Sequence, residues 1–317
     1  MSSEQPSCQA PPAHSHPHDA PRAHSAQRRL VLAMIVTGCF MVVEVIGGIV
    51  SGSLALLADA GHMFTDVGAL VLAYVSVRFG QRPPDARHGY GHRRMEVLSA
   101  FTNGVTMLLL SGWIILEAAH RLVTPAGVRS DTMLIVATAG LLANRGSLAI
   151  LHRGSHVHGG HDHGGRPLEG VQEDLAISGA AVHVVGDLLG SVAAIVAALV
   201  IRFTGWTPID PLLSVFIALL IVRSGWFIVR RSAHILLEGT PDHIDAERIH
   251  QDLRRVAGVA TTHHLHTWSL TSGEVLATLH VRLQPGAPAG EVIPKVRERL
   301  RLDFGIGHAT IEVDHDP

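Results

Sequence analysis

Six apolar segments, each about as long as a membrane-spanning helix, fill most of the chain before residue 230. A hydrocarbon core about 30 Å thick needs about 20 apolar residues in a helix, because each residue adds about 1.5 Å. With 47% hydrophobic residues, 16% charged residues and a mean hydropathy of +0.29, the chain is too apolar for an ordinary soluble enzyme. The sequence therefore predicts an all-α transmembrane bundle of six helices, near 30–50, 54–79, 96–122, 131–151, 174–203 and 209–229.

Arginines gather in alternate connections of this bundle, and they predict its orientation. They precede the first segment, lie between the second and third and between the fourth and fifth, and end the sixth, whereas the opposite side has only Arg121, Arg129 and Arg202. Because cytoplasmic loops carry the excess of Lys and Arg, both termini are expected in the cytoplasm. Residues 1–27, rich in Pro, Ser, Ala and His, predict a disordered tail before a transmembrane domain at 28–232. The formal charge of −2 gives no reason to expect nucleic acid as a partner.

Residues 240–317 differ in composition and predict a separate small domain. Their apolar patterns change between helical and strand periods in the order α-β-β-α-β, at 244–256, 262–270, 275–283, 291–302 and 308–313. This order suits an open sheet covered by two helices on one face. Since such a short segment is near the lower limit for an independent core, the domain is expected to dimerise.

Two of the apolar segments carry the same polar pattern, H-x-x-x-D, at His62 and Asp66 and again at His183 and Asp187. Positions four apart in a helix lie on one face, about 6 Å apart along the axis. Two facing helices would thus offer two imidazoles and two carboxylates, a tetrahedral set suited to Zn²⁺. An ionisable side chain within a bilayer is costly unless it faces a partner, a cavity or an ion. Hydrogen bonds between helices are the alternative explanation of the pairs.

The depth of the four residues tests whether the pairs can meet. If the second segment enters from the outside near Leu54, His62 and Asp66 lie about 12 and 18 Å into the hydrocarbon. If the fifth enters from the cytoplasm near Asp174, His183 and Asp187 lie about 14 and 20 Å deep. All four then fall near the midplane of a core about 30 Å thick, so that they can form one site.

Three stretches of the sequence resemble the cation diffusion facilitator family of zinc and cobalt exporters. SGSLALLADAGHMFTD, from Ser51 to Asp66, resembles the second-helix signature of the family. HGYGHRRMEVLSA, from His88 to Ala100, resembles its loop and third helix, and HHLHTW, from His263 to Trp268, resembles its cytoplasmic domain. The resemblance implies a homodimeric, proton-coupled exporter in a bacterial inner membrane, with six helices per subunit and a C-terminal α+β ferredoxin-like cytoplasmic domain.

The resemblance also assigns residues. It places the transport site at His62, Asp66, His183 and Asp187, with a histidine at position 62 going with zinc and cobalt rather than cadmium. It implies a loop metal site at Asp85, His88 and His92, and a cytoplasmic-domain site at His263, His280, Asp314 and Asp316. The helix at 291–302 has no histidine, whereas some members supply a ligand near its start. No prosthetic group is expected: Zn²⁺ is the transported substrate and a candidate regulatory ion, with Co²⁺, Cd²⁺ and Ni²⁺ as alternatives.

Histidines are also concentrated in the predicted cytoplasmic loop 152–166, which contains His152, His156, His158, His161 and His163. The N-terminal tail adds His14, His16, His18 and His24. Neutral imidazole is a common metal ligand, so these segments are expected to gather zinc, although a flexible polar linker explains them equally well.

Three other functions compete with export. An ATP-driven pump is disfavoured because the sequence has no G-x-x-x-x-G-K-[ST] loop. A membrane zinc enzyme of the metalloprotease kind is disfavoured because H-E-x-x-H is missing. A membrane-anchored zinc sensor would use the C-terminal domain, but it leaves the pairs near the midplane unexplained.

Overall fold

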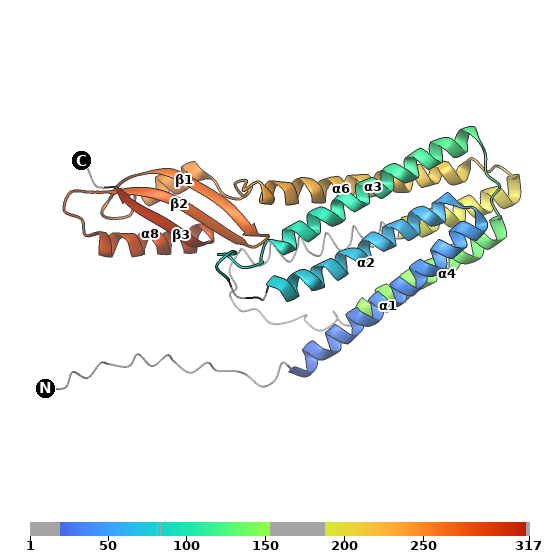
Figure 1. Ribbon diagram of the computed structural model, residues 1–317, viewed down its shortest axis with the longest axis horizontal. Helices are drawn as coiled ribbons and strands as arrows, with labels where there is room; N and C mark the ends of the chain where they lie inside the picture. Colours follow the sequence, from blue (N-terminus) through green and yellow to red (C-terminus); the bar gives the residue numbers. More distant parts are fainter. Residues whose placement is uncertain (1–19, 81, 83, 153–187, 315–317) are drawn as a thin grey trace.

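The computed structural model describes residues 20–80, 82, 84–152 and 188–314, as a helical bundle followed by a small α/β domain (Figure 1). The bundle helices are α1 (Ala20–Ser51), α2 (Leu54–Gly80), α3 (Met95–Val123), α4 (Ser130–His152), the apolar helix Leu188–Thr204 and α6 (Ile209–Leu236). Helix α1 begins inside the segment 1–27 that was predicted to be disordered, so the end of that segment is helical. Helix α6 continues past the predicted end at 229 and past the domain boundary at 232.

Three helices of the described chain, namely α2, α3 and α6, are long and apolar enough to cross a membrane. The segments Ile35–Ser51 and Leu188–Thr204 are shorter apolar helices. Large apolar side chains lie on the outer surface of the bundle, including Leu109 (71% exposed) and Leu116 (72%) on α3. Such a surface requires lipid around it. The described part of the chain therefore supports a helical transmembrane domain, while the number of six spans stays a prediction.

Small residues let the helices of the bundle approach closely, which is how helices associate in lipid. Helix α3 packs along α6 and also against α2, and α1 packs along α4. A Cβ atom added to Gly104 of α3 would lie 2.8 Å from Val229 Cγ2 of α6, so that a larger residue there would force α6 side chains to move. At the end of the bundle away from the C-terminal domain, the turn between α1 and α2 uses Gly52 with a left-handed φ of 74° (Figure 1). This turn contacts the start of α6 through the carboxylate of Asp210.

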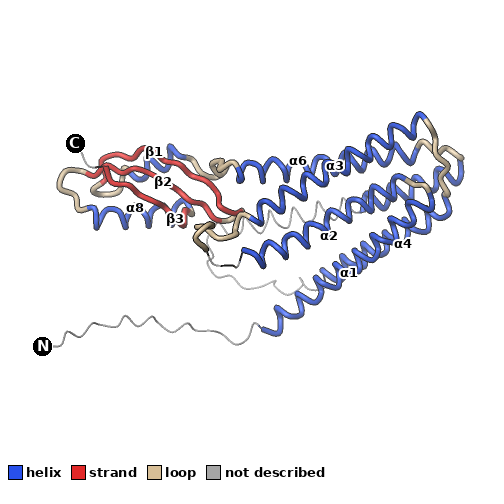
Figure 2. The backbone as a smooth tube through the Cα atoms, viewed as in Figure 1, coloured by secondary structure: helices blue, strands red, loops and turns tan. Residues whose placement is uncertain are grey.

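The C-terminal domain has the predicted element order. It consists of α7 (Ala246–Leu253), β1 (Val259–Thr271), β2 (Glu274–Leu283), α8 (Ala289–Phe304) and β3 (Ile306–Asp314). The strands form one sheet in the order β1-β2-β3, in which β1 and β2 are antiparallel and β2 and β3 are parallel (Figure 2). Helix α7 is shorter than predicted and begins after Asp245, whose carboxylate accepts a hydrogen bond from the backbone N–H of Glu247 at 3.0 Å. A ferredoxin-like fold stays an expectation from the family.

One face of the sheet holds the core of this domain. Along β2, alternate side chains point to the two faces of the sheet, and Val275, Ala277, Leu279 and Val281 are buried with the apolar residues of both helices. Because α7 and α8 share this cluster, both helices lie on the same face, as predicted. The alternation places His280 on the opposite face, where its side chain is partly exposed.

The C-terminal domain lies beyond the end of the bundle at which α1 begins and α6 ends (Figure 1). Two ion pairs join the segment before α3 to this domain and to the linker that precedes it. Arg93 contacts Glu274 at the β1–β2 turn at 2.6 Å, and Arg94 contacts Glu238, after α6, at 2.8 Å. The segment between α2 and α3 is thus in direct contact with the C-terminal domain.

Candidate metal sites

The first predicted pair lies on one face of α2, as its spacing requires. His62 Nε2 is 3.9 Å from Asp66 Oδ2, and the side chains are 12% and 22% exposed. Since α2 is one of the helices of spanning length, an imidazole and a carboxylate lie side by side within an apolar helix. They offer a nitrogen and an oxygen ligand directed to the same region.

The second predicted pair, His183 and Asp187, lies outside the described residues. The apolar helix Leu188–Thr204 follows directly in the sequence. Its first turn contacts α2, because the hydroxyl of Ser191 donates a hydrogen bond to Asp59 Oδ2 at 3.3 Å. Asp59 is three residues before His62, which is about 4.5 Å along the helix axis. The described part of this helix therefore packs against α2 close to the level of His62.

The predicted loop site is a tight turn between α2 and α3. Asp85 Oδ1 accepts hydrogen bonds from the backbone N–H groups of Arg87 and His88, at 2.8 and 2.7 Å, and lies 3.0 Å from His88 Nδ1. The two backbone N–H donors, followed by the His88 ring, lower the pKa of the Asp85 carboxyl and so favour its charged form. The rings of His88 and His92 lie 4.4 Å apart. The structure thus brings the three residues into one turn on the surface.

The predicted site in the C-terminal domain combines residues of three strands. His263 of β1 pairs with His280 of β2, and their ring centroids are 5.3 Å apart. Asp314, at the end of β3, lies 2.9 Å from His263 Nε2 and 3.3 Å from His280 Nδ1. Asp316, the fourth predicted residue, lies outside the described residues. Two nitrogens and a carboxylate therefore meet on the face of the sheet that the helices leave uncovered.

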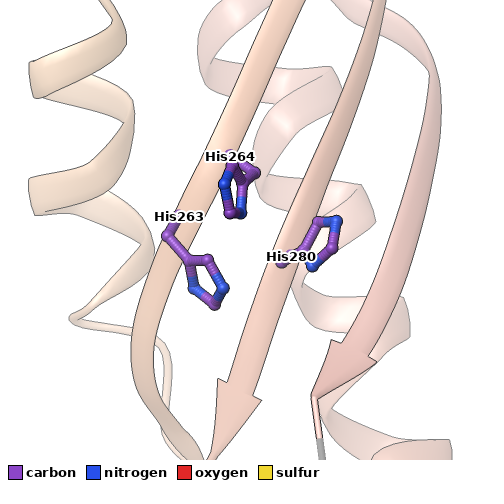
Figure 3. Close-up of side chains that lie close together, drawn as sticks. All are labelled: His263, His264 and His280. Atoms are coloured by element: carbon purple, nitrogen blue, oxygen red, sulfur yellow. The ribbon is translucent and has the colours of Figure 1, made fainter.

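His264 completes this cluster, and sequence reasoning missed it. Neighbouring residues of a regular strand point to opposite faces, so His264 was not expected beside His263. The pairing of β1 with β2 is interrupted between His263 and His266, and His264 has a left-handed φ of 48°. This bulge turns both side chains to one face, where the ligand atoms of His263, His264 and His280 lie within 4.8 Å of one another (Figure 3). The histidine repeat at 263–264 was the only sequence signal.

These observations define a class of protein. Apolar helices of spanning length, a partly buried His–Asp pair on one of them and a small domain with clustered imidazoles are typical of a membrane transporter for metal cations. The chain belongs to the cation efflux family: residues 30–237 match the cation efflux transmembrane domain, and residues 241–316 match the cytoplasmic domain of cation efflux proteins. The protein is thus a membrane transporter of metal cations and not an enzyme.

Curated relatives match along almost the whole chain. The zinc transporter ZitB of Pectobacterium atrosepticum is 42% identical over 304 residues, covering 96% of this chain and 89% of the relative. ZitB of Escherichia coli is also 42% identical and covers 96% and 93%. The cadmium, cobalt and zinc/H(+)-K(+) antiporter of Bacillus velezensis is 35% identical and covers 95% and 91%.

Proposed function

We propose that the protein exports Zn²⁺ from the cytoplasm in exchange for protons, through a site formed by His62, Asp66, His183 and Asp187. The observation that carries the proposal is the His62–Asp66 pair, whose ligand atoms are 3.9 Å apart on a helix of spanning length. The names of the relatives support zinc as the substrate, and one of them is named as an antiporter. The sequence repeat of the pair in the fifth apolar segment supports a second half of the site.

Ligand chemistry supplies the coupling between the two ions. Zinc needs neutral imidazole and ionised carboxylate, so that Zn²⁺ and protons compete for the same atoms. A site open to a near-neutral cytoplasm takes up Zn²⁺ and sheds protons. The same site, open to a more acidic exterior, is protonated on the imidazoles of His62 and His183 and releases the metal. Proton entry then drives zinc exit without ATP.

The C-terminal cluster suits a regulatory role better than transport. It lies on a sheet outside the bundle, and its three imidazoles and one carboxylate form a typical zinc ligand set (Figure 3). We assign Zn²⁺ sensing to His263, His264, His280 and Asp314, and we assign Asp85, His88 and His92 to a weaker surface site. The family match of this domain supports a homodimer. The arginine distribution supports an inner-membrane orientation with both termini in the cytoplasm.

Zinc flux into sealed vesicles tests the proposal. In purified protein reconstituted into vesicles that are acidified inside, zinc uptake should proceed, and a protonophore should slow it. Asp66→Ala and Asp187→Ala should each abolish uptake while leaving the protein folded in the membrane, because each removes a charged ligand of the shared site. Asp131→Ala is a matched control, since Asp131 is an exposed acid that contacts Arg202 at 3.1 Å, away from the site.

Three outcomes would contradict parts of this proposal. If Asp66→Ala or Asp187→Ala took up zinc at the wild-type rate, the shared site would be excluded. Zinc movement without a change of internal pH would exclude proton exchange even if the site were correct. Zinc binding with no flux at all would favour a membrane-anchored sensor, which would use only the C-terminal cluster.

A further inference from the structure

A buried contact joins α2 to the helix that follows His183 and Asp187 in the sequence. The Ser191 hydroxyl donates a hydrogen bond to Asp59 Oδ2 at 3.3 Å, and the two residues are 0% and 1% exposed. The amide of Asn144, on α4, reaches Ser191 Oγ at 3.5 Å. Three helices therefore meet at one hydroxyl and one carboxylate.

Gly190 shows how closely the two helices approach here. A Cβ atom added to Gly190 would overlap Asp59 Oδ1. The carboxylate of Asp59 thus lies directly against the backbone of the neighbouring helix. A side chain at position 190 would occupy the space that this carboxylate fills. A buried carboxylate within a bilayer is costly, so its retention at such a contact calls for a specific role.

The position of the contact relative to the ligands suggests that role. Asp59 is three residues before His62, and Ser191 is four residues after Asp187. On α2 the contact thus lies about one helical turn from His62, and in the sequence it follows the second proposed pair by four residues. Metal sites tolerate errors of only about 0.2 Å in ligand distance. A hydrogen bond at this level of α2 fixes the spacing and the register between α2 and the helix Leu188–Thr204.

We infer that Asp59, through Ser191 and against Gly190, is a positioning residue that sets the geometry of the transport site. This inference rests on the proposed His62, Asp66, His183 and Asp187 site and adds how its two halves are aligned. Asp59 acts through the helices and does not bind the ion itself. A loosened contact should therefore weaken metal binding and distort the tetrahedral geometry while all four ligands remain.

Co²⁺ bound to the full-length protein in lipid nanodiscs is a suitable probe, because its visible absorption is intense only in tetrahedral sites. Subtracting the spectrum of Asp66→Ala isolates the transport site from the other cobalt sites. Ser191→Ala and Asp59→Ala should weaken Co²⁺ binding at this site about 10- to 100-fold, as loss of a group that orients metal ligands does, and should lower the absorption per bound ion. Ser191→Thr, which keeps the hydroxyl, should restore both properties. In the variant that combines the Asp59 and Ser191 substitutions, the loss of Co²⁺ binding free energy should be smaller than the sum of the losses in the two single variants.

Ser76→Ala is the matched control. Ser76 is a buried serine of α2 that bonds Ser99 of α3 at 2.6 Å, so it loses a similar contact to a different helix. Its cobalt spectrum should equal that of the wild type. Unchanged affinity and spectrum in Ser191→Ala, with His62→Ala abolishing the signal, would overturn the positioning role and leave the site intact. A full cobalt signal in His62→Ala would instead overturn the proposed site, and the inference with it.

Discussion

Asp210, in the first turn of α6, caps the first turn of α2 through Leu54, a residue 156 positions earlier in the chain. Asp210 Oδ2 accepts a hydrogen bond from the backbone N–H of Leu54 at 2.7 Å, and Oδ1 accepts one from the hydroxyl of Ser53 at 2.6 Å and one from the backbone N–H of Ala55 at 3.2 Å. The carboxylate thus satisfies the free N–H groups at the start of α2 and complements the helix dipole. The helix that carries His62 and Asp66 is therefore held at its N-terminal end by α6.

Replacement of Asp210 should destabilise the bundle. Asp210→Ala leaves two buried N–H groups and a hydroxyl without their acceptor, so we expect a loss of about 1–3 kcal/mol in the free energy of unfolding. Asp210→Asn keeps one acceptor oxygen and should fall between Asp210→Ala and the wild type. Thermal unfolding of the protein in detergent measures the effect. Asp131→Asn, an exposed acid near the same end, should change little. Equal unfolding midpoints for Asp210→Ala and the wild type would exclude the capping role.

Substitution of His62 should change metal selectivity. His62→Asp exchanges a borderline nitrogen for a hard oxygen and adds a negative charge. We expect weaker discrimination against Cd²⁺, mainly because the family resemblance links a histidine at this position with zinc over cadmium. Uptake of Zn²⁺ and Cd²⁺ into vesicles, measured as a ratio, checks the change. If that ratio equals the wild-type ratio, His62 does not set selectivity.

The left-handed conformation of His264 should lower the stability of the metal-free C-terminal domain, while its imidazole contributes to zinc binding. His264→Gly removes an imidazole but relieves the left-handed conformation, which costs roughly 1–2 kcal/mol for a residue with a Cβ atom. We expect the metal-free C-terminal domain to become more stable, while the increase in its melting temperature caused by zinc becomes smaller. His266→Ala, on the same strand beyond the bulge, is the control and should keep the zinc effect. A full zinc effect in His264→Gly would remove this residue from the ligand set.

An ion pair between α7 and α8 should make stability depend on pH. The Arg299 guanidinium contacts both oxygens of Asp252, at 2.7 and 3.0 Å, and holds the pKa of that carboxyl below its usual value. A lowered pKa in the folded state means that the carboxylate stabilises the domain above its unfolded pKa, and that this contribution is lost as pH falls through the folded pKa.

Arg299→Gln should therefore lower the melting temperature at neutral pH, by less than Asp210→Ala does because the pair is largely solvated. The difference from the wild type should shrink in acid. Arg301→Gln, which breaks a pair with Glu298 inside α8, is the matched control and should have a smaller effect. A difference that is constant from neutral to acidic pH would show that Asp252 is not the titrating partner.

Local periodicity in the sequence was enough to determine much of this protein. Apolar runs of spanning length predicted α2, α3 and most of α6, and the four-residue spacing predicted that His62 and Asp66 share a face. Both follow from the geometry of a single helix. The order α-β-β-α-β in the C-terminal domain was also predicted, because apolar residues repeat with different periods in helices and in strands.

Only the tertiary structure decided which residues meet across elements. Asp210 caps α2 and Ser191 contacts Asp59, although 156 and 132 residues separate the partners, and no local pattern records such distances. The sequence analysis did not assign His264 to the site, because the β-bulge that turns its side chain beside His263 depends on the pairing with β2. The sequence by itself thus determined the spanning helices of the described chain, the order of the C-terminal elements and the types of the candidate ligands. The packing between elements decides how the candidate ligands are aligned, since that depends on contacts that form only when the chain has folded.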